Sequence, residues 1–147
     1  MTPRTALTTE PLDLVALLAG VASPANGALV VFLGTVREVN DGRSVSGIEY
    51  SAYEAMAAAE LEAIASEACH RFGSGFARIV HRLGTLAIED VSVGIAVGHA
   101  HRAEAYEMSR WIIEELKRRV PIWKREHYVD GTREWVDPTA ARMAGRP

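Results

Sequence analysis

The chain has 147 residues, 48% of them hydrophobic, and a formal net charge of −3. That length supports one domain with a substantial core and is short for two. No apolar run reaches the roughly 20 residues needed to span a bilayer, and the first ten residues lack the apolar block of a secretory signal. One cysteine allows no internal disulfide, which fits a reducing cytoplasm. Because a slightly acidic chain lacks the basic footprint of nucleic-acid binders, we expect a cytoplasmic protein that binds neither nucleic acid nor membrane.

The first half of the chain predicts a short helix followed by two strands. Thr9 to Val21 combines a potential N-cap at its first residue, a proline in the first turn and leucines on one face. The unbroken apolar run Ala28 to Val36 is typical of a strand buried on both faces. Residues 40–43, Asn-Asp-Gly-Arg, favour a tight turn before a second strand, Val45 to Tyr53. We expect these two strands to pair as a hairpin, with Arg37 where the first strand leaves the core.

The middle of the chain predicts a long helix and then several short strands. Glu54 to Phe72 carries one apolar stripe at helical spacing and ends before the Gly-Ser-Gly of residues 73–75. Phe76 to Leu83 and Thr85 to Ile88 are candidate strands. Val91 to Val97 alternates large β-branched residues with small ones. The small face predicts that another element packs closely against this strand.

A last helix is predicted from Arg102 to Arg119, with charged pairs on its outer side. The acids at 114 and 115 each precede an arginine by four residues, which gives Arg118 and Arg119 surface partners. Trp111 falls among polar residues and is a candidate for an interface. The inward face of this helix is expected to comprise Ala105, Tyr106, Ser109, Ile112, Ile113, Leu116 and Val120.

Together these elements predict an α+β fold with a mainly antiparallel sheet packed by about three helices. The sequence contains no internal repeat, and its only low-complexity patch is the alanine-rich segment Ala55 to Ala59. We therefore expect a single domain over residues 1–137, followed by a disordered tail over residues 138–147.

The most unusual stretch of the chain is a dense run of positive charge. Five of the nine residues from Lys117 to Arg125 are cationic in a chain whose net charge is negative. Pro121 lacks an N–H donor and its ring clashes with the preceding helical turn, so it ends the last helix. Lys117 then lies in the final helical turn and Lys124 on a differently directed segment, so that the two amines can converge on one point. The alternative is a solvated basic helix end, since cations are favoured at the C-terminal pole of a helix.

Other polar residues offer further candidate sites. His101 and Arg102 precede the last helix, where exposed N–H groups, an imidazole and a guanidinium form an anion site typical for phosphate; the alternative is a capping or surface role. His81, His99 and His101 lack the i,i+4 spacing of a zinc site, so we expect no metal. Cys69 lies beside the apolar stripe of its helix and is expected to be structural.

Four motifs follow one another in a distinctive order. They are Phe32-Leu33-Gly34-Thr35-Val36-Arg37, His81-Arg82-Leu83-Gly84, Ala100-His101-Arg102 and the Lys-x-Arg-x-Pro-x-Trp-Lys pattern of residues 117–124. Over about Glu10 to Trp135 the chain resembles the large, catalytic subunit of molybdopterin synthase, the MoaE family. The last motif is the most specific of the four. The resemblance implies the α/β hammerhead fold of that family.

The resemblance also implies an activity in molybdenum cofactor biosynthesis. That family forms the dithiolene of molybdopterin from cyclic pyranopterin monophosphate, with sulfur from the thiocarboxylated C-terminus of a small ubiquitin-like carrier of the MoaD type. By resemblance, Lys117 and Lys124 are the catalytic pair, and Arg37, His101 and Arg102 bind the anionic substrate. No cofactor is implied, because the partner thiocarboxylate supplies the sulfur, and one buried cysteine could not readily supply two sulfurs.

The resemblance further implies an assembly and leaves two competing functions to test. The family forms a homodimer within a heterotetramer, in which the His101-Arg102 pair can reach the pocket of the neighbouring subunit. One alternative is a non-catalytic module that uses segment 117–125 to bind an acidic protein or RNA, with steep salt dependence. The other is a Schiff-base enzyme that uses Lys117 on a carbonyl substrate.

Overall fold

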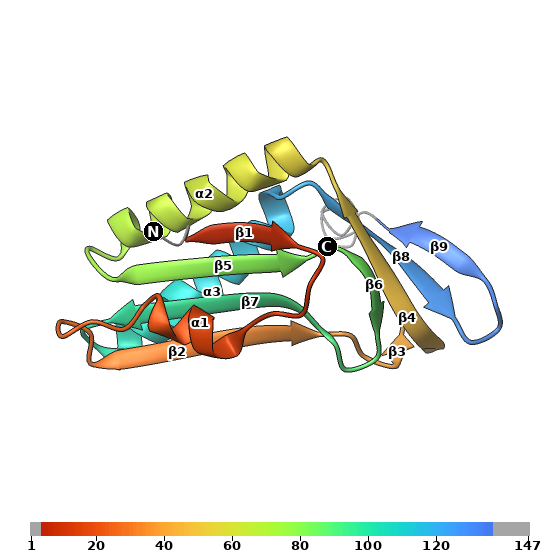
Figure 1. Ribbon diagram of the computed structural model, residues 1–147, viewed down its shortest axis with the longest axis horizontal. Helices are drawn as coiled ribbons and strands as arrows, with labels where there is room; N and C mark the ends of the chain where they lie inside the picture. The colour runs from red at the N-terminus through yellow and green to blue at the C-terminus, as the bar shows by residue number, and fades with distance from the viewer. Residues whose placement is uncertain (1–3, 137–147) are drawn as a thin grey trace.

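The computed structural model describes residues 4–136, which form three helices and nine strands in two sheets (Figure 1). The first sheet has four strands, in the order β1 (Thr5–Thr8), β5 (Phe76–Arg82), β7 (Val91–His99) and β2 (Ala28–Thr35). The second has five, β3 (Val39–Asn40), β4 (Arg43–Ala52), β8 (Ile122–Tyr128) and β9 (Arg133–Val136) in that order, with β6 (Gly84–Ala87) also paired to β4. Among the strand pairs within residues 4–136, β1–β5 alone is parallel. The predicted α+β class is confirmed, whereas the expected tail at 138–147 lies outside the described residues.

The three helices cover both faces of the first sheet. Helices α2 (Glu54–Arg71) and α3 (Arg102–Arg119) pack side by side on one face, and α1 (Leu14–Ala19) packs on the other (Figure 1). Strand β7 is buried on both faces because its large residues face α2 and α3 while its small residues face α1. A Cβ at Gly94 would lie 2.8 Å from side-chain atoms of Leu12 and Leu17. The close approach predicted for the small face of this strand is therefore confirmed.

The break after α3 also follows the prediction from Pro121. The helix ends at Arg119, and the Val120 N–H still donates to the Leu116 carbonyl at 3.0 Å. The chain then enters β8, which runs antiparallel to β4 with Lys124 opposite Tyr50. The second sheet thus begins where the last helix ends, and the two lysines lie on elements with different directions.

Several local predictions are wrong at the N-terminal end. Helix α1 begins at Leu14 rather than near Thr9, because Asp13 is the residue that caps it: its carboxylate accepts from the Ala16 N–H at 3.1 Å. Thr5–Thr8, which precede the predicted helix, form β1, a strand that the sequence pattern did not predict. The short apolar face of α1 packs against the small residues of β7 and against Val80 of β5.

Strand β2 is not the doubly buried strand that its apolar run predicts. It lies at the edge of the first sheet, and four of its large side chains are exposed: Leu29, Val31, Phe32 and Leu33. Nor does it pair with β4, since its partner is β7. The hairpin formed by the Asn-Asp-Gly-Arg turn instead joins β3 to β4, with Asp41 and Gly42 both at positive φ. That backbone geometry belongs to a two-residue turn between antiparallel strands.

The predicted inward face of α3 is correct except for an aromatic residue. Tyr106 is 65% exposed, and Met108, which the projection omitted, is completely buried. Trp111 is partly buried and packs against the core, with its ring edge-on to Phe72 at 6.3 Å between centroids; its predicted role at an interface stays a prediction.

One of the two charge pairs predicted on α3 is confirmed and the other is wrong. Arg119 pairs with Glu115 at 3.5 Å as expected, whereas Arg118 pairs with Glu115 instead of Glu114. Arg119 also bonds to Glu60 and Glu67, and so links α3 to α2. Both arginines therefore have acidic partners outside the pocket. Of the helices described here, none is both long and apolar enough to cross a membrane.

Candidate active site

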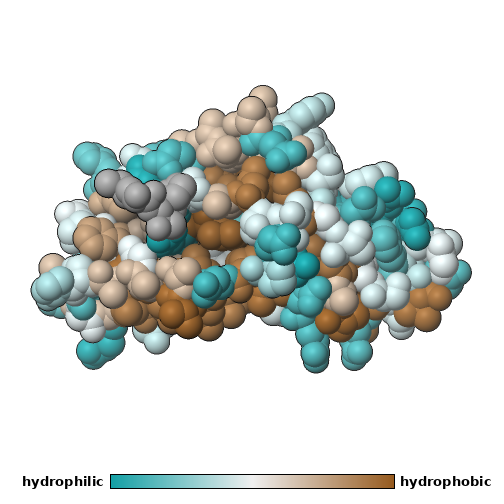
Figure 2. Space-filling view, in the orientation of Figure 1, coloured by the Kyte–Doolittle hydropathy of each residue, from teal (hydrophilic) through white to brown (hydrophobic). Residues whose placement is uncertain are grey.

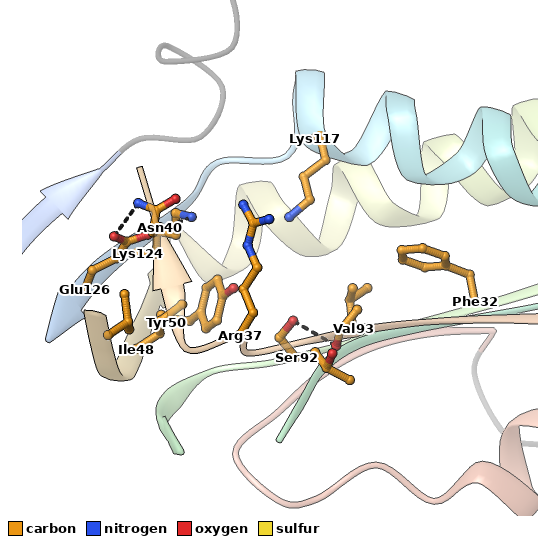
Figure 3. Close-up of a pocket in the computed structure, with 13 residues that line it drawn as sticks. Phe32, Arg37, Asn40, Ile48, Tyr50, Ser92, Val93, Lys117, Lys124 and Glu126 are labelled. Carbon is orange, nitrogen blue, oxygen red and sulfur yellow. Dashed lines mark hydrogen bonds and ion pairs between the residues drawn. The ribbon is translucent and has the colours of Figure 1, made fainter. Parts of the chain in front are cut away.

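A cavity of about 240 Å³ lies where the two sheets meet the end of α3. Its walls come from six strands and helices far apart in the sequence, so it exists only in the folded chain. The apolar part of the lining comes from β2, β4 and β7 and includes one aromatic ring from each of the first two strands (Figure 3). The lining residues are Phe32, Gly34, Thr35, Arg37, Asn40, Val45, Ile48, Tyr50, Ser92, Val93, Lys117, Lys124 and Glu126.

Three cationic side chains converge on this cavity. Lys117 comes from the last turn of α3, Lys124 from β8, and Arg37 from the segment that follows β2. Figure 3 shows the amine of Lys117 and the guanidinium of Arg37 pointing toward one another. Like charges repel in a partly desolvated space unless an anion lies between them. The arrangement is therefore suited to bind anionic groups, and it brings together three of the five site residues predicted from the sequence.

A buried carboxylate organises one side of the pocket. Glu126 is only 1% exposed, and its Oε1 lies 3.0 Å from Nζ of Lys124. Its Oε2 accepts from the Asn40 amide at 2.6 Å and from the Tyr128 hydroxyl at 2.7 Å. Burial raises the pKa of Glu126, but the bonds from Tyr128, Lys124 and Asn40 outweigh that effect and hold the pKa below its usual value. Glu126 is thus an ionised partner that fixes the position of Lys124.

Sequence reasoning did not assign roles to Glu126, Asn40 or Tyr50. A signal for the first was present, because Lys124, Glu126 and Tyr128 alternate along residues 122–128 as side chains on one face of a strand do. The run of charged residues in this segment obscured the pattern. Asn40 and Tyr50 come beside Lys124 and Glu126 through the pairing of β4 with β8, which no local pattern specifies.

The other predicted pair, His101 and Arg102, lies away from this pocket within one chain. Both residues line a separate hollow of about 340 Å³ with Gly27, Ala28 and the start of α3. Ala28 pairs with His99 at one end of β2, and Thr35 pairs with Val91 near the other. The eight residues of β2 span roughly 25 Å at the usual rise of a strand. The lysine pocket and the His101-Arg102 hollow therefore lie near opposite ends of one edge strand.

The histidine next to this hollow has a structural explanation. His99 is buried, its Nε2 lies 3.1 Å from the Phe72 carbonyl, and its Nδ1 lies 3.3 Å from the His101 N–H. A neutral imidazole protonated at Nε2 satisfies both contacts. His99 therefore holds the loop that presents His101. Among residues 4–136, no three His, Cys, Asp or Glu side chains are grouped so that they could hold a metal ion.

Comparison with known proteins identifies the family. The family model described as MoaE protein matches residues 7–119. The chain belongs to the MoaE family. The resemblance inferred from the motifs is thus confirmed.

Relatives in fungi and bacteria carry the name molybdopterin synthase catalytic subunit. The MoaE relative of Emericella nidulans is 43% identical over 129 residues, which cover 88% of this chain and 66% of the relative. The relative of Halalkalibacterium halodurans is 42% identical over 133 residues, covering 90% of this chain and 85% of its own. The crystal structure of molybdopterin synthase from Staphylococcus aureus matches the fold with a TM-score of 0.88 at 35% identity, covering 92% of this chain and 98% of that one.

Proposed function

We propose that this chain is the catalytic subunit of a molybdopterin synthase in molybdenum cofactor biosynthesis. It transfers sulfur from the thiocarboxylated C-terminus of a small ubiquitin-like carrier of the MoaD type to cyclic pyranopterin monophosphate, and forms the dithiolene of molybdopterin. The observation that carries the proposal is the convergence of Lys117, Lys124 and Arg37 on one pocket of a MoaE-family fold. These cations suit a phosphate-bearing substrate and a charged thiocarboxylate. In this proposal the reaction takes place in the cytoplasm.

The two lysines take different parts in the proposed reaction. Lys117 contacts the thiocarboxyl carbon or the substrate intermediate, because its amine projects into the cavity from the end of α3 (Figure 3). Lys124 is paired with Glu126 and orients the substrate or transfers protons. Arg37 binds an anionic group of the substrate. This division follows the electrostatic difference between an amine paired to a buried carboxylate and one that faces a guanidinium.

The sulfur comes from the carrier, and the protein needs no cofactor of its own for the transfer. The described cysteine, Cys69, is half-buried on α2 and does not line the lysine pocket. Burial raises the pKa of the Cys69 thiol, which disfavours the nucleophilic thiolate. An external donor with a reactive terminal thiocarboxylate meets the requirement for two sulfurs.

A second copy of the chain completes the substrate site. His101 and Arg102 lie about one strand length from Arg37, along the exposed edge strand β2. A two-fold axis near Phe32 would bring the Arg37 end of one β2 beside the Gly27 end of its partner. The exposed apolar residues of β2 supply the contact surface for such a homodimer. With one carrier at each lysine pocket, the assembly is a heterotetramer.

Reconstitution of the reaction tests this proposal. The protein is mixed with thiocarboxylated carrier and cyclic pyranopterin monophosphate, and the dithiolene product is measured by mass. We expect product with the native chain, none with Lys117→Ala, and retained binding of the carrier by that variant. Arg110→Ala is the matched control, because Arg110 is a highly exposed cation of the same helix outside the pocket.

The same experiment separates the enzyme from its alternatives. Near-normal turnover of Lys117→Ala would sink the assignment of that lysine. No product from the native chain in a validated assay would favour the non-catalytic module, whose affinity for polyanions falls steeply with salt. Trapping of Lys117 by borohydride without any carrier would favour the Schiff-base enzyme.

A further inference from the structure

His81 is a buried titratable residue directly behind the lysine pocket, and the reaction proposed above gives it no role. It is 1% exposed and lies at the end of β5. Its register partner on β7 is Val93, and its ring meets the Tyr50 ring edge-on, with 5.1 Å between centroids. Both neighbours line the pocket. His81 therefore forms the layer of side chains immediately beneath the pocket wall.

The hydrogen bonding of His81 defines its tautomer. Nδ1 lies 2.8 Å from the carbonyl oxygen of Arg82. A carbonyl oxygen can only accept, so Nδ1 carries the hydrogen and Nε2 of the neutral ring presents a lone pair. The ring consequently offers one acceptor to the interior of the protein.

The protonation state of His81 is linked to Lys117. Burial lowers the pKa of His81 to about 4, with a further lowering from the positive charge of Lys117 and an opposing effect of the Arg82 carbonyl. The imidazole is therefore neutral at physiological pH. It is also too weak a base to take the proton from a lysine ammonium group, whose ordinary pKa is about 10.4. His81 can accept a hydrogen bond from an ammonium group without removing its proton.

We propose that His81 is a positioning residue for Lys117, whose ammonium group donates to Nε2 of the buried neutral imidazole. The two titratable side chains that act on the ring are Lys117 from α3 and Tyr50 from β4. The bond orients the amine toward the cavity and stabilises its charged form until sulfur transfer begins. The inference rests on the proposed function, because it concerns the lysine assigned to that transfer.

Two substitutions of His81 distinguish the roles of its two ring nitrogens. In His81→Asn the side-chain amide can replace Nδ1 as donor to Arg82 but leaves nothing at the position of Nε2. In His81→Gln the longer side chain places an amide at the position of Nε2. A purely structural role through the Arg82 carbonyl predicts that Asn is the better substitute. Positioning of Lys117 predicts that Gln is better.

The readout is the pH dependence with which Lys117 is acylated in the full-length protein, measured by mass spectrometry. Loss of a bond to the ammonium form makes the amine easier to deprotonate. We expect the labelling midpoint of Lys117 to move to lower pH by about one unit or more in His81→Asn and by only a few tenths in His81→Gln. Product formation should fall at least about 10-fold in His81→Asn and less than about 3-fold in His81→Gln. The proposal is overturned if both variants have the same labelling midpoint and product formation, or if His81→Asn is closer to the native protein than His81→Gln.

A second measurement leaves His81 intact and so does not depend on how its variants fold. The ¹⁵N resonances of the imidazole are compared between the native protein and Lys117→Met. We expect the Nε2 resonance to move when the amine is removed while Nδ1 stays in place; an unchanged Nε2 resonance contradicts the contact. Labelling and NMR need no carrier, so a failure of the synthase reaction with the expected labelling pattern would refute the proposed function and leave the positioning role standing.

Discussion

Lys124 and Glu126 lie on the same face of β8, with Nζ of the lysine 3.0 Å from Oε1 of the glutamate. The carboxylate is buried and also accepts from Asn40 and Tyr128, so its position is defined from three directions. A lysine held in this way keeps two further N–H donors at a defined position beside the cavity. The pair thus converts a flexible side chain into an oriented donor at the edge of the cavity.

Replacing Glu126 by Gln removes the charge and keeps the volume. Lys124 then faces Arg37 and Lys117 without a compensating anion, and we expect product formation to fall at least about 10-fold. The free energy of unfolding should fall by about 1–3 kcal/mol, since a partly buried charge loses its partner. Turnover assays and denaturant unfolding measure both effects. Glu134→Gln is the control because Glu134 pairs with Arg43 at the surface; a similar loss of activity in that variant would contradict the role of Glu126.

The lowered pKa of Glu126 predicts how the difference in unfolding free energy between the native protein and Glu126→Gln depends on pH. Burial opposes ionisation, but the bonds from Tyr128, Lys124 and Asn40 give a folded-state pKa below that of the unfolded chain. The stabilisation is therefore fully present above the unfolded value of about 4.3 and is lost as pH falls through the folded value. Urea unfolding of the native protein and Glu126→Gln should show a difference in unfolding free energy that is constant above about pH 5 and becomes smaller below about pH 4. A stability difference that grows as the pH falls would contradict an ionised Glu126 in the folded protein.

Mixed dimers test whether the substrate site is shared between two copies. If Lys117 acts with Arg102 of the partner subunit, Lys117→Ala and Arg102→Ala are each inactive alone, yet their heterodimer contains one intact site. Random assembly of equal amounts makes half of the dimers mixed, so co-expression should restore about one quarter of native activity. Product formation by the purified mixture measures this. No recovery would contradict a substrate site shared between two copies.

The long helices could be predicted from the sequence because their signals are local. The apolar stripe containing Leu61 and Ile64 and the break before Pro121 lie within single segments, and α2 and α3 end within about one residue of the predicted positions. The convergence of Lys117 and Lys124 followed from the same break. The positions of residues that are set by spacing along one helix or strand could thus be predicted from the sequence.

Strand pairing was not accessible in the same way. An apolar run such as Leu29 to Leu33 has the same composition whether the strand lies inside a sheet or at an edge that another molecule covers. The register that places Tyr50 opposite Lys124 depends on contacts between segments that are 70 or more residues apart. His101 and Arg102 show the same limit, since their distance from the lysine pocket is set by the length and pairing of β2.

Arg119 gives a prediction about the packing of the two long helices. Its Nε donates to Glu60 at 3.0 Å and its terminal nitrogen to Glu67 at 2.8 Å, both on α2. Because these acids are partly exposed, Arg119→Ala should cost only about 1 kcal/mol of unfolding free energy, and less at high salt. The hydrogen bond from Arg119 lowers the pKa of Glu67, so the difference should also shrink as pH falls below about 4. Thermal unfolding at two salt concentrations measures this, with Arg118→Ala as a control expected to leave the stability nearly unchanged, because Arg118 is exposed and pairs only within its own helix. An equal loss of stability in both variants would mean that the ion pairs between α2 and α3 add nothing to the free energy of unfolding.

Leu29 tests whether the exposed edge strand is the contact between two copies. It is 45% exposed on β2, between the lysine pocket of one copy and the His101-Arg102 hollow of the other in the proposed dimer. Burying a lysine in an apolar contact is costly, so Leu29→Lys should weaken self-association at least about 10-fold. Sedimentation velocity over a dilution series measures the change, and activity should fall in parallel if, as proposed, each site takes Arg102 from a second copy. Val129→Lys is the matched control, since Val129 is more exposed and lies beyond β8, away from β2. Unchanged association of Leu29→Lys together with native activity would exclude β2 as the dimer contact and would place the second copy elsewhere on the protein.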